Sequence, residues 1–424
     1  MQIKLITLVL FMFCLNCSVC WKLKDILPIK YDVVRVRSEQ QMRSVGNRYA
    51  VLDFIGLVER HSGYTAEEYK LTTRDGYISL LHRITGSPFS PKAPGKPIVF
   101  LQHGMLLSSD CFVLTGPGKD LAFLLADAGY DVWLGNTRGN AYGRSHVNLK
   151  PQDKKFWNFS FHEIAIYDLS LQMDYALKIT SQARLILIAY SMGTTEAFAL
   201  LATRPEYNSK VSLLINFTPI VFWKHKLPPQ MKWIIDNREA IKEFLDRHQH
   251  YEIFPQSSFI GNLGKYFCSD KTKSTQILFC NGFFTAVVPM VDVARINSTT
   301  YSTFLSYFPS GTSAKCFEHY IQLILSQRFQ AFDYGPQLNY IKYKKTRPPT
   351  YDLNRVTVPT ALYYGKKDYF ASPEDIVYLA KKLPNVVLLK QIPNDSFNHL
   401  DVLINKDVKS LLYDRVISLI HKFT

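Results

Sequence analysis

Three residues of the chain have side chains suited to nucleophilic catalysis, and they occur in the order Ser191, Asp368, His399. A free hydroxyl group is a weak nucleophile, so a catalytic serine needs a histidine that takes its proton. That histidine in turn needs an acid that fixes its tautomer and stabilises the imidazolium. The three residue types therefore predict acyl transfer, with Ser191 as nucleophile, His399 as base and Asp368 as acid.

Ser191 lies within the segment LILIAYSMG at 185–193. The four apolar residues 185–188 predict a strand that is buried on both faces of a parallel sheet. The following TTEAFALLAT has apolar residues at helical spacing. A serine between a strand and a helix indicates the nucleophile elbow of an α/β-hydrolase, although Ala189 replaces the first glycine of G-x-S-x-G. The alternative interpretation is a chance strand-to-helix turn.

A second predicted strand, IVFLQHG at 98–104, leads into the loop-like segment GMLLSSDCFVLTGPGKD at 104–120. In this architecture, a backbone N–H just after such a strand forms half of the oxyanion hole. We assign that N–H to Met105 and the other half to Met192, directly after the nucleophile. We interpret His103 as a structural residue that positions the loop rather than as the base.

The predicted acid and base also follow apolar runs. Asp368 comes just after ALYYG, and the loop NDSFNH after the predicted strand NVVLLKQIP contains His399. Because the carboxyl ends of parallel strands meet at one edge of a sheet, these residues are expected near Ser191.

The order of predicted elements indicates an α/β-hydrolase fold with a mostly parallel central sheet and an inserted helical cap and lid. Strands and helices alternate over 21–220, including a hairpin at 66–85 around Asp75-Gly76, and the pattern resumes over 346–424. Between them, 221–345 has helical patterns without obvious parallel strands, and 266–291 is a candidate lid. A plain helical subdomain is the alternative for this insertion.

The first 20 residues, MQIKLITLVLFMFCLNCSVC, have the pattern of a signal peptide, with Lys4 before an apolar stretch and small residues after it. An uncleaved anchor is the alternative, but the apolar stretch is short for a span that needs about 20 residues. No other stretch is a candidate membrane span. The prediction is a secreted protein, and a lysosomal one would carry the same signal.

The chain has 424 residues, a formal net charge of +15 and 47% hydrophobic residues, which is ordinary globular composition apart from the charge. The cations are spread along the chain, with the densest cluster, KKTR, at 344–347. We interpret this charge as favouring solubility or attraction to anionic surfaces. No motif for nucleic acid, cofactor or metal binding is predicted.

Secretion permits disulfides and N-glycosylation. Cys268 and Cys280 are the closest cysteines in sequence outside the signal peptide and form a candidate disulfide. Sequons occur at Asn158, Asn216, Asn297 and Asn394. Asn216 ends an apolar run and Asn394 is near the predicted active site, so Asn297 is favoured as the glycan carrier, with Asn158 and Asn394 as further candidates.

The sequence resembles the animal acid lipases, the family of gastric and lysosomal acid lipases and their insect relatives. The resemblance runs from about Asp53 to the C-terminus and is carried by long blocks, among them 63–84, 101–147, 156–169, 308–335 and SFNHLDVL at 396–403. It implies hydrolysis of carboxylic esters in neutral lipids, above all triacylglycerols, at a lipid–water interface. By position it also implies Ser191, Asp368 and His399 as the triad and Met105 and Met192 as oxyanion donors.

The chain departs from the family at two places. The family usually has G-H-S-Q-G where this chain has AYSMG, which puts rate and substrate preference in doubt. The cap disulfide typical of stomach members has Cys268 as one half, whereas its other half falls near Thr275 or Gln276. A sterol-ester hydrolase and a catalytically weakened lipid-binding protein are the alternative functions.

Overall fold

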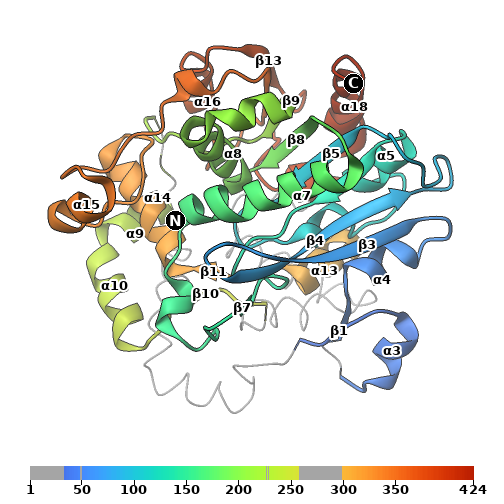
Figure 1. The fold of residues 1–424 in the computed structure, drawn as a ribbon, viewed down its shortest axis with the longest axis horizontal. Coiled ribbons are helices and arrows are strands. Elements are labelled where there is room, and N and C mark those ends of the chain that lie inside the picture. Colours follow the sequence, from blue (N-terminus) through green and yellow to red (C-terminus); the bar gives the residue numbers. More distant parts are fainter. Residues whose placement is uncertain (1–32, 48–49, 226, 228, 257–297) are drawn as a thin grey trace.

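A computed structural model describes residues 33–47, 50–225, 227, 229–256 and 298–424. In this part of the chain the central feature is a nine-stranded sheet with the order β13-β12-β9-β8-β5-β6-β4-β3, and β7 pairs with β4 (Figure 1). The strands are β3 Thr65–Thr72, β4 Tyr77–Gly86, β5 Ile98–Gln102, β6 Asp131–Leu134, β7 Ser145–His146, β8 Leu185–Tyr190, β9 Val211–Phe217, β12 Thr360–Tyr364 and β13 Val386–Gln391.

The six strands from β13 to β6 are all parallel to their neighbours in the sheet. Helices connect them: α5 Leu121–Asp127 between β5 and β6, α7 Ser170–Thr180 before β8, α8 Met192–Thr203 after β8 and α16 Pro373–Ala380 between β12 and β13. The predicted parallel sheet with helical crossovers is therefore present, and β8 lies near its centre.

The sheet is buried on both faces at its centre, where β8 and its neighbour β5 consist mostly of apolar residues and are buried at every position. Side chains of a strand alternate between faces, so Ile186 and Ile188 of β8 pack in one core and Leu185 and Leu187 in the other. The first core contains residues of α5 and of the last helix, α18 Asp414–Ile420. The second contains residues of α7, α8 and α16, which gives three layers.

The predicted hairpin at 66–85 is present as the antiparallel pair β3 and β4. Its turn has Gly76 at φ +94°, a conformation that glycine adopts without the penalty a Cβ would bring. β4 also pairs antiparallel with β6, which joins the hairpin to the parallel strands.

The segment between β9 and β12 leaves the sheet, although these two strands are neighbours, with Thr360 opposite Leu214. Its described helices are α9 Pro229–Asp236, α10 Arg238–Arg247, α13 Ser298–Tyr307, α14 Ala314–Ser326 and α15 Pro336–Tyr343. A short antiparallel pair, β10 Glu252–Ile253 and β11 Thr312–Ser313, lies among them. This arrangement agrees with a helical insertion, and the boundaries 221–345 remain predictions.

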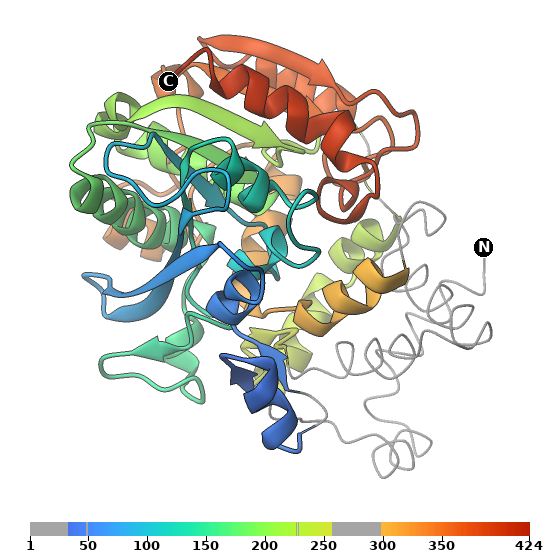
Figure 2. The ribbon, with the colours of Figure 1, turned by 90° about the vertical axis from the view of Figure 1, so that its right-hand side faces the viewer.

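The N-terminal segment packs against the inserted segment (Figure 2). It consists of β1 Arg35–Val36, α3 Glu39–Ser44, β2 Val51–Leu52 and α4 Phe54–Glu59. Val51 and Leu52 pair with β1. The helix α4 begins after them, and the side chain of Asp53 caps it by accepting from the Gly56 N–H.

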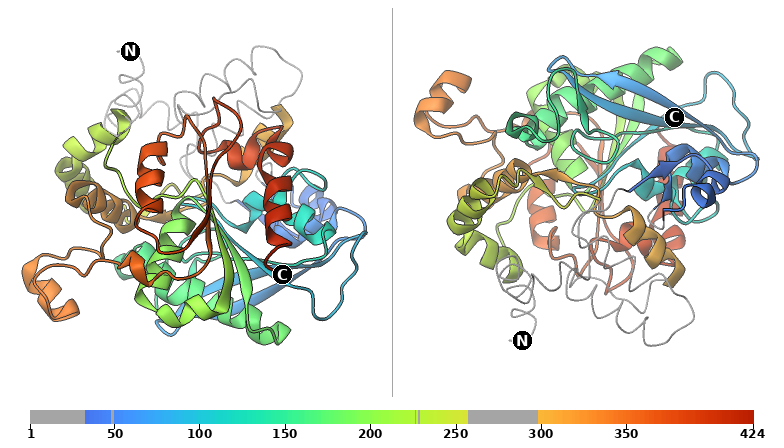
Figure 3. Two further views of the ribbon diagram at one scale, coloured as in Figure 1. Left: turned by 90° about the horizontal axis from the view of Figure 1, so that it is seen from above. Right: turned by 90° about the horizontal axis from the view of Figure 1, so that it is seen from below.

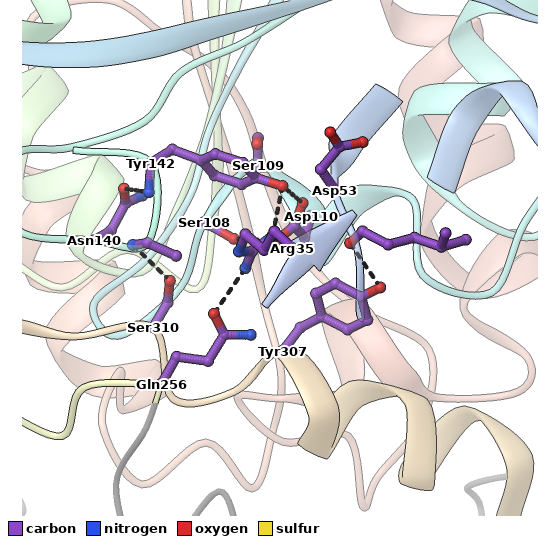
Figure 4. A network of polar contacts seen from close by, with 12 residues as sticks. Arg35, Asp53, Ser108, Ser109, Asp110, Asn140, Tyr142, Gln256, Tyr307 and Ser310 are labelled. Atoms are coloured by element: carbon purple, nitrogen blue, oxygen red, sulfur yellow. Dashed lines mark hydrogen bonds and ion pairs between the residues drawn. The ribbon is translucent and has the colours of Figure 1, made fainter. Parts of the chain in front are cut away.

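Arg35 of β1 connects three parts of the chain, as Figure 4 shows. Its guanidinium donates to Asp110 at 2.8 Å and to the hydroxyl of Tyr142, and a further bond of 3.0 Å goes to Gln256. Asp110 lies in the turn Ser109–Phe112. This turn follows residues 103–108, which contain the predicted oxyanion donor Met105 and are called the oxyanion loop below. The network therefore ties the N-terminal segment, that turn and the start of the inserted segment together.

Several predictions fall outside the described residues: the signal peptide at 1–20, the candidate lid at 266–291, the Cys268–Cys280 pair and Asn297. Of the described helices, none is long and apolar enough to span a membrane.

Candidate active site

Ser191 occupies a sharp turn between β8 and α8. Its backbone has φ +53° and ψ −120°, a combination that is strained for a residue with a side chain. The turn requires close packing, because a Cβ on Gly193 would lie 2.8 Å from the backbone oxygens of Gln102 and His103. This geometry is that of a nucleophile elbow, and it leaves Ser191 8% exposed.

The structure brings the three predicted residues together. The Oγ atom of Ser191 lies 2.7 Å from Nε2 of His399, and Nδ1 of the same ring lies 2.9 Å from Oδ2 of Asp368. Both distances are hydrogen-bond distances. With Nδ1 donating to the carboxylate, Nε2 is left as the acceptor that faces the serine hydroxyl.

Asp368 follows β12 and is fixed by its own loop. Its Oδ1 accepts the backbone N–H groups of Phe370 and Ala371, each at 2.9 Å, so the other oxygen is the one directed at His399. The ring of Phe370 also packs edge-on against the imidazole of His399, with centroids 5.3 Å apart. The carboxylate is therefore oriented before any substrate binds.

The predicted oxyanion donors, Met105 and Met192, belong to two segments that both adjoin Ser191. Met192 is the first residue of α8, where the helix leaves its first N–H groups without acceptors in the helix itself. Gly104, the residue before Met105, approaches the serine so closely that a Cβ there would lie 2.8 Å from the Ser191 Cβ. The Gly104–Met105 peptide thus lies beside the nucleophile, where an oxyanion donor is needed.

His103 is buried behind this loop. Its Nδ1 donates to the Gly104 carbonyl at 2.8 Å, and its Nε2 accepts from the side chain of Asn140 at 3.1 Å. Burial lowers the pKa of His103 to about 4, so the ring stays neutral. These contacts agree with a loop-positioning residue and not with a base.

Sequence reasoning missed the role of Asn140. Its amide also donates to the Leu107 carbonyl at 3.3 Å, so one side chain holds both ends of the oxyanion loop. The only signal was its place in the glycine-rich segment GNTRGNAYG, which turns sharply after β6.

A second serine–histidine pair lies away from the elbow. Ser109 Oγ is 2.7 Å from Nδ1 of His82, and Nε2 of that ring is 3.3 Å from Glu68. Both Ser109 and His82 are fully buried, and the ring of Phe54 stacks on His82 at 4.2 Å. A substrate cannot reach this hydroxyl, so the pair is structural.

A buried acid lies on α8, just after the elbow. Glu196 accepts a hydrogen bond of 2.7 Å from the amide of Gln102, and its other oxygen has no partner among the described residues. Burial raises the pKa of Glu196 well above its usual range. Burial therefore favours the protonated, uncharged form of this side chain.

The predicted modification sites differ in accessibility. Asn158 is exposed and Asn394 is half-buried, whereas Asn216 is fully buried in β9 and is closed to a glycan in the folded chain. Cys111 and Cys316 are buried free thiols.

Comparison with known proteins shows what this chain is similar to. The model of the partial α/β-hydrolase lipase region matches residues 57–116, and that of the α/β-hydrolase fold matches 97–256. The chain is 36% identical to lipase 1 of Drosophila melanogaster over 361 residues, 85% of this chain and 78% of that protein. It is 35% identical to human gastric triacylglycerol lipase over 365 residues, 84% of this chain and 88% of that protein.

The chain belongs to the α/β-hydrolase lipase family. The predictions of this family, of the fold and of a carboxylic ester hydrolase of the lipase class are confirmed. Among solved structures, DcsB in complex with a substrate analogue has a TM-score of 0.51 at 13% identity and covers 85% of this chain and 99% of that chain. At that identity the likeness concerns the fold alone.

Proposed function

We propose that this lipase-family member is a secreted enzyme that hydrolyses triacylglycerols and related neutral lipid esters at a lipid–water interface, with Ser191, His399 and Asp368 as its triad. The observation that carries the proposal is the hydrogen-bonded chain from the Ser191 hydroxyl through the His399 ring to Asp368, with distances of 2.7 and 2.9 Å. The similarity to gastric triacylglycerol lipase supports the substrate class.

In the acylation step, Nε2 of His399 takes the proton of Ser191 as Oγ attacks the ester carbonyl carbon. The carbonyl oxygen becomes negative and accepts hydrogen bonds from the N–H groups of Met105 and Met192. When the tetrahedral intermediate collapses, the ester C–O bond breaks and the protonated His399 gives its proton to the departing alcohol. The acyl group then remains on Ser191.

In the second step, water attacks the acyl-enzyme while His399 accepts one of its protons. Collapse of the second intermediate releases a carboxylic acid and returns the proton to Ser191. Asp368 keeps its charge throughout and stabilises the imidazolium by the bond to Nδ1.

The proposed substrates have long acyl chains, and these chains determine what kind of surface the protein needs. Burial of an acyl chain stabilises the complex by about 0.8 kcal/mol for each methylene group removed from water. A protein that binds them needs apolar surface that is covered in water and opened at lipid. The inserted helical segment between β9 and β12 supplies the position for such a cover.

The test is the release of fatty acid from emulsified triolein, cholesteryl oleate and phosphatidylcholine by the secreted protein, at pH 5 and pH 7. We expect triolein to be hydrolysed fastest and Ser191→Ala to lose activity on every ester. Ser109→Ala is the matched control, because it removes another serine hydroxyl that lies beside a histidine, and it should retain most activity. A fully active Ser191→Ala would refute the mechanism, and preference for cholesteryl oleate would change the substrate class.

A further inference from the structure

Helix α15, Pro336–Tyr343, carries apolar side chains that no described part of the chain covers. Leu338, Tyr340 and Ile341 are 51%, 61% and 64% exposed, although the helix belongs to an otherwise well-packed chain. Figures 1 and 3 show α15 projecting from the body at one end of the molecule. Such a cluster indicates an interaction surface.

The orientation of these side chains follows from the one residue of α15 that is buried. Asn339 lies against the body, and successive helical residues are rotated by about 100°. Ile341 therefore lies nearly opposite Asn339, with Leu338 and Tyr340 on either side of it. The outward face of the helix thus carries Ile341 beside Gln337, with the apolar side chains of Leu338 and Tyr340 on its two flanks.

Hydrogen bonds hold this face in place. The Asn339 amide donates to Asp333 at 2.7 Å and to the Thr346 carbonyl at 3.0 Å, and its oxygen accepts the Tyr334 N–H at 2.9 Å. One side chain therefore joins the segments before and after α15. The exposed residues are presented by a fixed helix.

The same segment is strongly basic. Residues 335–351 contain Lys342, Lys344, Lys345 and Arg347 and no acidic residue. All four cations are exposed, and in the described part of the chain no ion pair involves them. The Lys342 ammonium lies over the ring of Tyr334 at 4.6 Å. The exposed apolar side chains of Leu338, Tyr340 and Ile341 thus lie beside positive charge that no ion pair among the described residues neutralises.

We propose that α15 and the following KKTR segment, residues 336–347, form a docking surface for an anionic lipid surface. The helix would lie in the headgroup region, with Leu338, Tyr340 and Ile341 inserted and the lysine and arginine side chains reaching the negative headgroups. This proposal goes beyond the proposed hydrolysis and does not depend on it.

Charge and size favour lipid over other occupants. A second copy of this chain would bring the same positive segment and the same net charge of +15. A stable protein interface buries about 800 Å² on each partner, which an eight-residue helix does not supply by itself. Insertion into headgroups needs no matching shape, only apolar groups and cations.

The test is flotation of the full chain with vesicles, in a Ser191→Ala background that keeps the lipids intact. We expect roughly tenfold or stronger binding to vesicles of equal phosphatidylcholine and phosphatidylglycerol than to phosphatidylcholine alone, at about 0.1 M salt. Lys344→Ser, Lys345→Ser and Arg347→Ser together should lower binding to the anionic vesicles by about tenfold or more. Leu338→Ser with Ile341→Ser should lower it by about fivefold.

Two controls match these variants. Substitution of Lys119, Lys381 and Lys422 by serine removes the same charge from other exposed positions, and Phe89→Ser removes an exposed apolar side chain elsewhere. Both should bind within about twofold of the parent. In the catalytically intact background, all four variants should hydrolyse a soluble p-nitrophenyl ester at the parent rate, which shows that they fold.

Three results would overturn the proposal. One is failure of the parent protein to distinguish anionic from zwitterionic vesicles. The second is equal loss of binding in the KKTR variant and its charge-matched control, which would mean general electrostatic attraction. The third is retention of binding in both the Leu338/Ile341 variant and the KKTR variant, which would leave a protein partner as the occupant of this face.

Discussion

The hydroxyl of Tyr190 donates a hydrogen bond of 3.0 Å to the backbone oxygen of His399. The residue before the proposed nucleophile thus holds the residue proposed as its base, and the two rings lie 5.4 Å apart between centroids. Tyr190 is part of AYSMG, the segment that departs from the family pattern. A residue that differs from the family pattern, Tyr190, therefore makes a hydrogen bond to His399.

We expect Tyr190→Phe to lower kcat by about threefold to tenfold with little change in KM, because His399 loses a bond that positions it. Stability should fall by about 1 kcal/mol. The matched control is Tyr77→Phe, which removes a similar buried bond from strand β4 to the Phe156 carbonyl. Steady-state kinetics and thermal unfolding of both variants check this. An equal loss of kcat in both would refute a positioning role for Tyr190.

Asp368→Asn should lower kcat by about 10⁴-fold while the chain stays folded. The amide oxygen of the asparagine would keep the bonds to the Phe370 and Ala371 N–H groups, so its NH₂ group would face His399. Nδ1 must then accept a hydrogen bond, so the ring proton is on Nε2. A protonated Nε2 cannot take the proton of Ser191.

The control is Asp375→Asn, which alters another aspartate that pairs with a histidine, here His225 at 2.8 Å. Hydrolysis of a soluble ester by this variant should stay within a few-fold of the wild-type rate. Wild-type turnover in Asp368→Asn would remove Asp368 from the triad.

Two nearby arginines should differ in their effect on stability. Arg35→Met leaves the fully buried Asp110 without its cation, and removal of one partner from a buried pair costs about 3 kcal/mol or more. Arg37→Met breaks a more exposed pair with Asp53 and should cost about 1 kcal/mol or less. Urea unfolding measures both, and similar losses would contradict the importance of the network in Figure 4.

Glu196 should make the folded state less stable as the pH rises. Its pKa is raised by burial, so the folded chain holds a proton that the unfolded chain releases near pH 4.3. The stabilisation is complete below that pH and is lost as pH rises toward the folded pKa. Glu196→Gln stays neutral and lacks this loss, so the Tm of the wild type should fall relative to the variant between pH 5 and pH 9.

The control for this comparison is Glu239→Gln, which alters an exposed carboxylate. The difference in Tm between this variant and the wild type should be constant from pH 6 to pH 9. If the wild type and Glu196→Gln also differ by a constant amount over this range, Glu196 does not bind the extra proton.

The sequence determined the strands and turns around the site and the order of the three proposed catalytic residues along the chain. Four consecutive apolar residues before Ser191 are enough to predict a strand buried on both faces, because such a run has no polar side to expose. The turn Asp75-Gly76 likewise predicts its hairpin from local backbone preference. The triad followed from its order along the chain and from the family resemblance, since each residue comes just after an apolar run.

Only the tertiary structure decided which serine has an accessible histidine. Ser109 with His82 and Ser191 with His399 have the same hydrogen-bond distance, and they are separated by the full burial of Ser109 and by the elbow backbone of Ser191. The contacts made by Tyr190, Asn140 and Arg35 join residues far apart in the chain, and no local pattern encodes them. The physical reason is that hydrophobic periodicity acts over a few neighbouring residues, whereas these bonds depend on how the strands and the inserted segment pack.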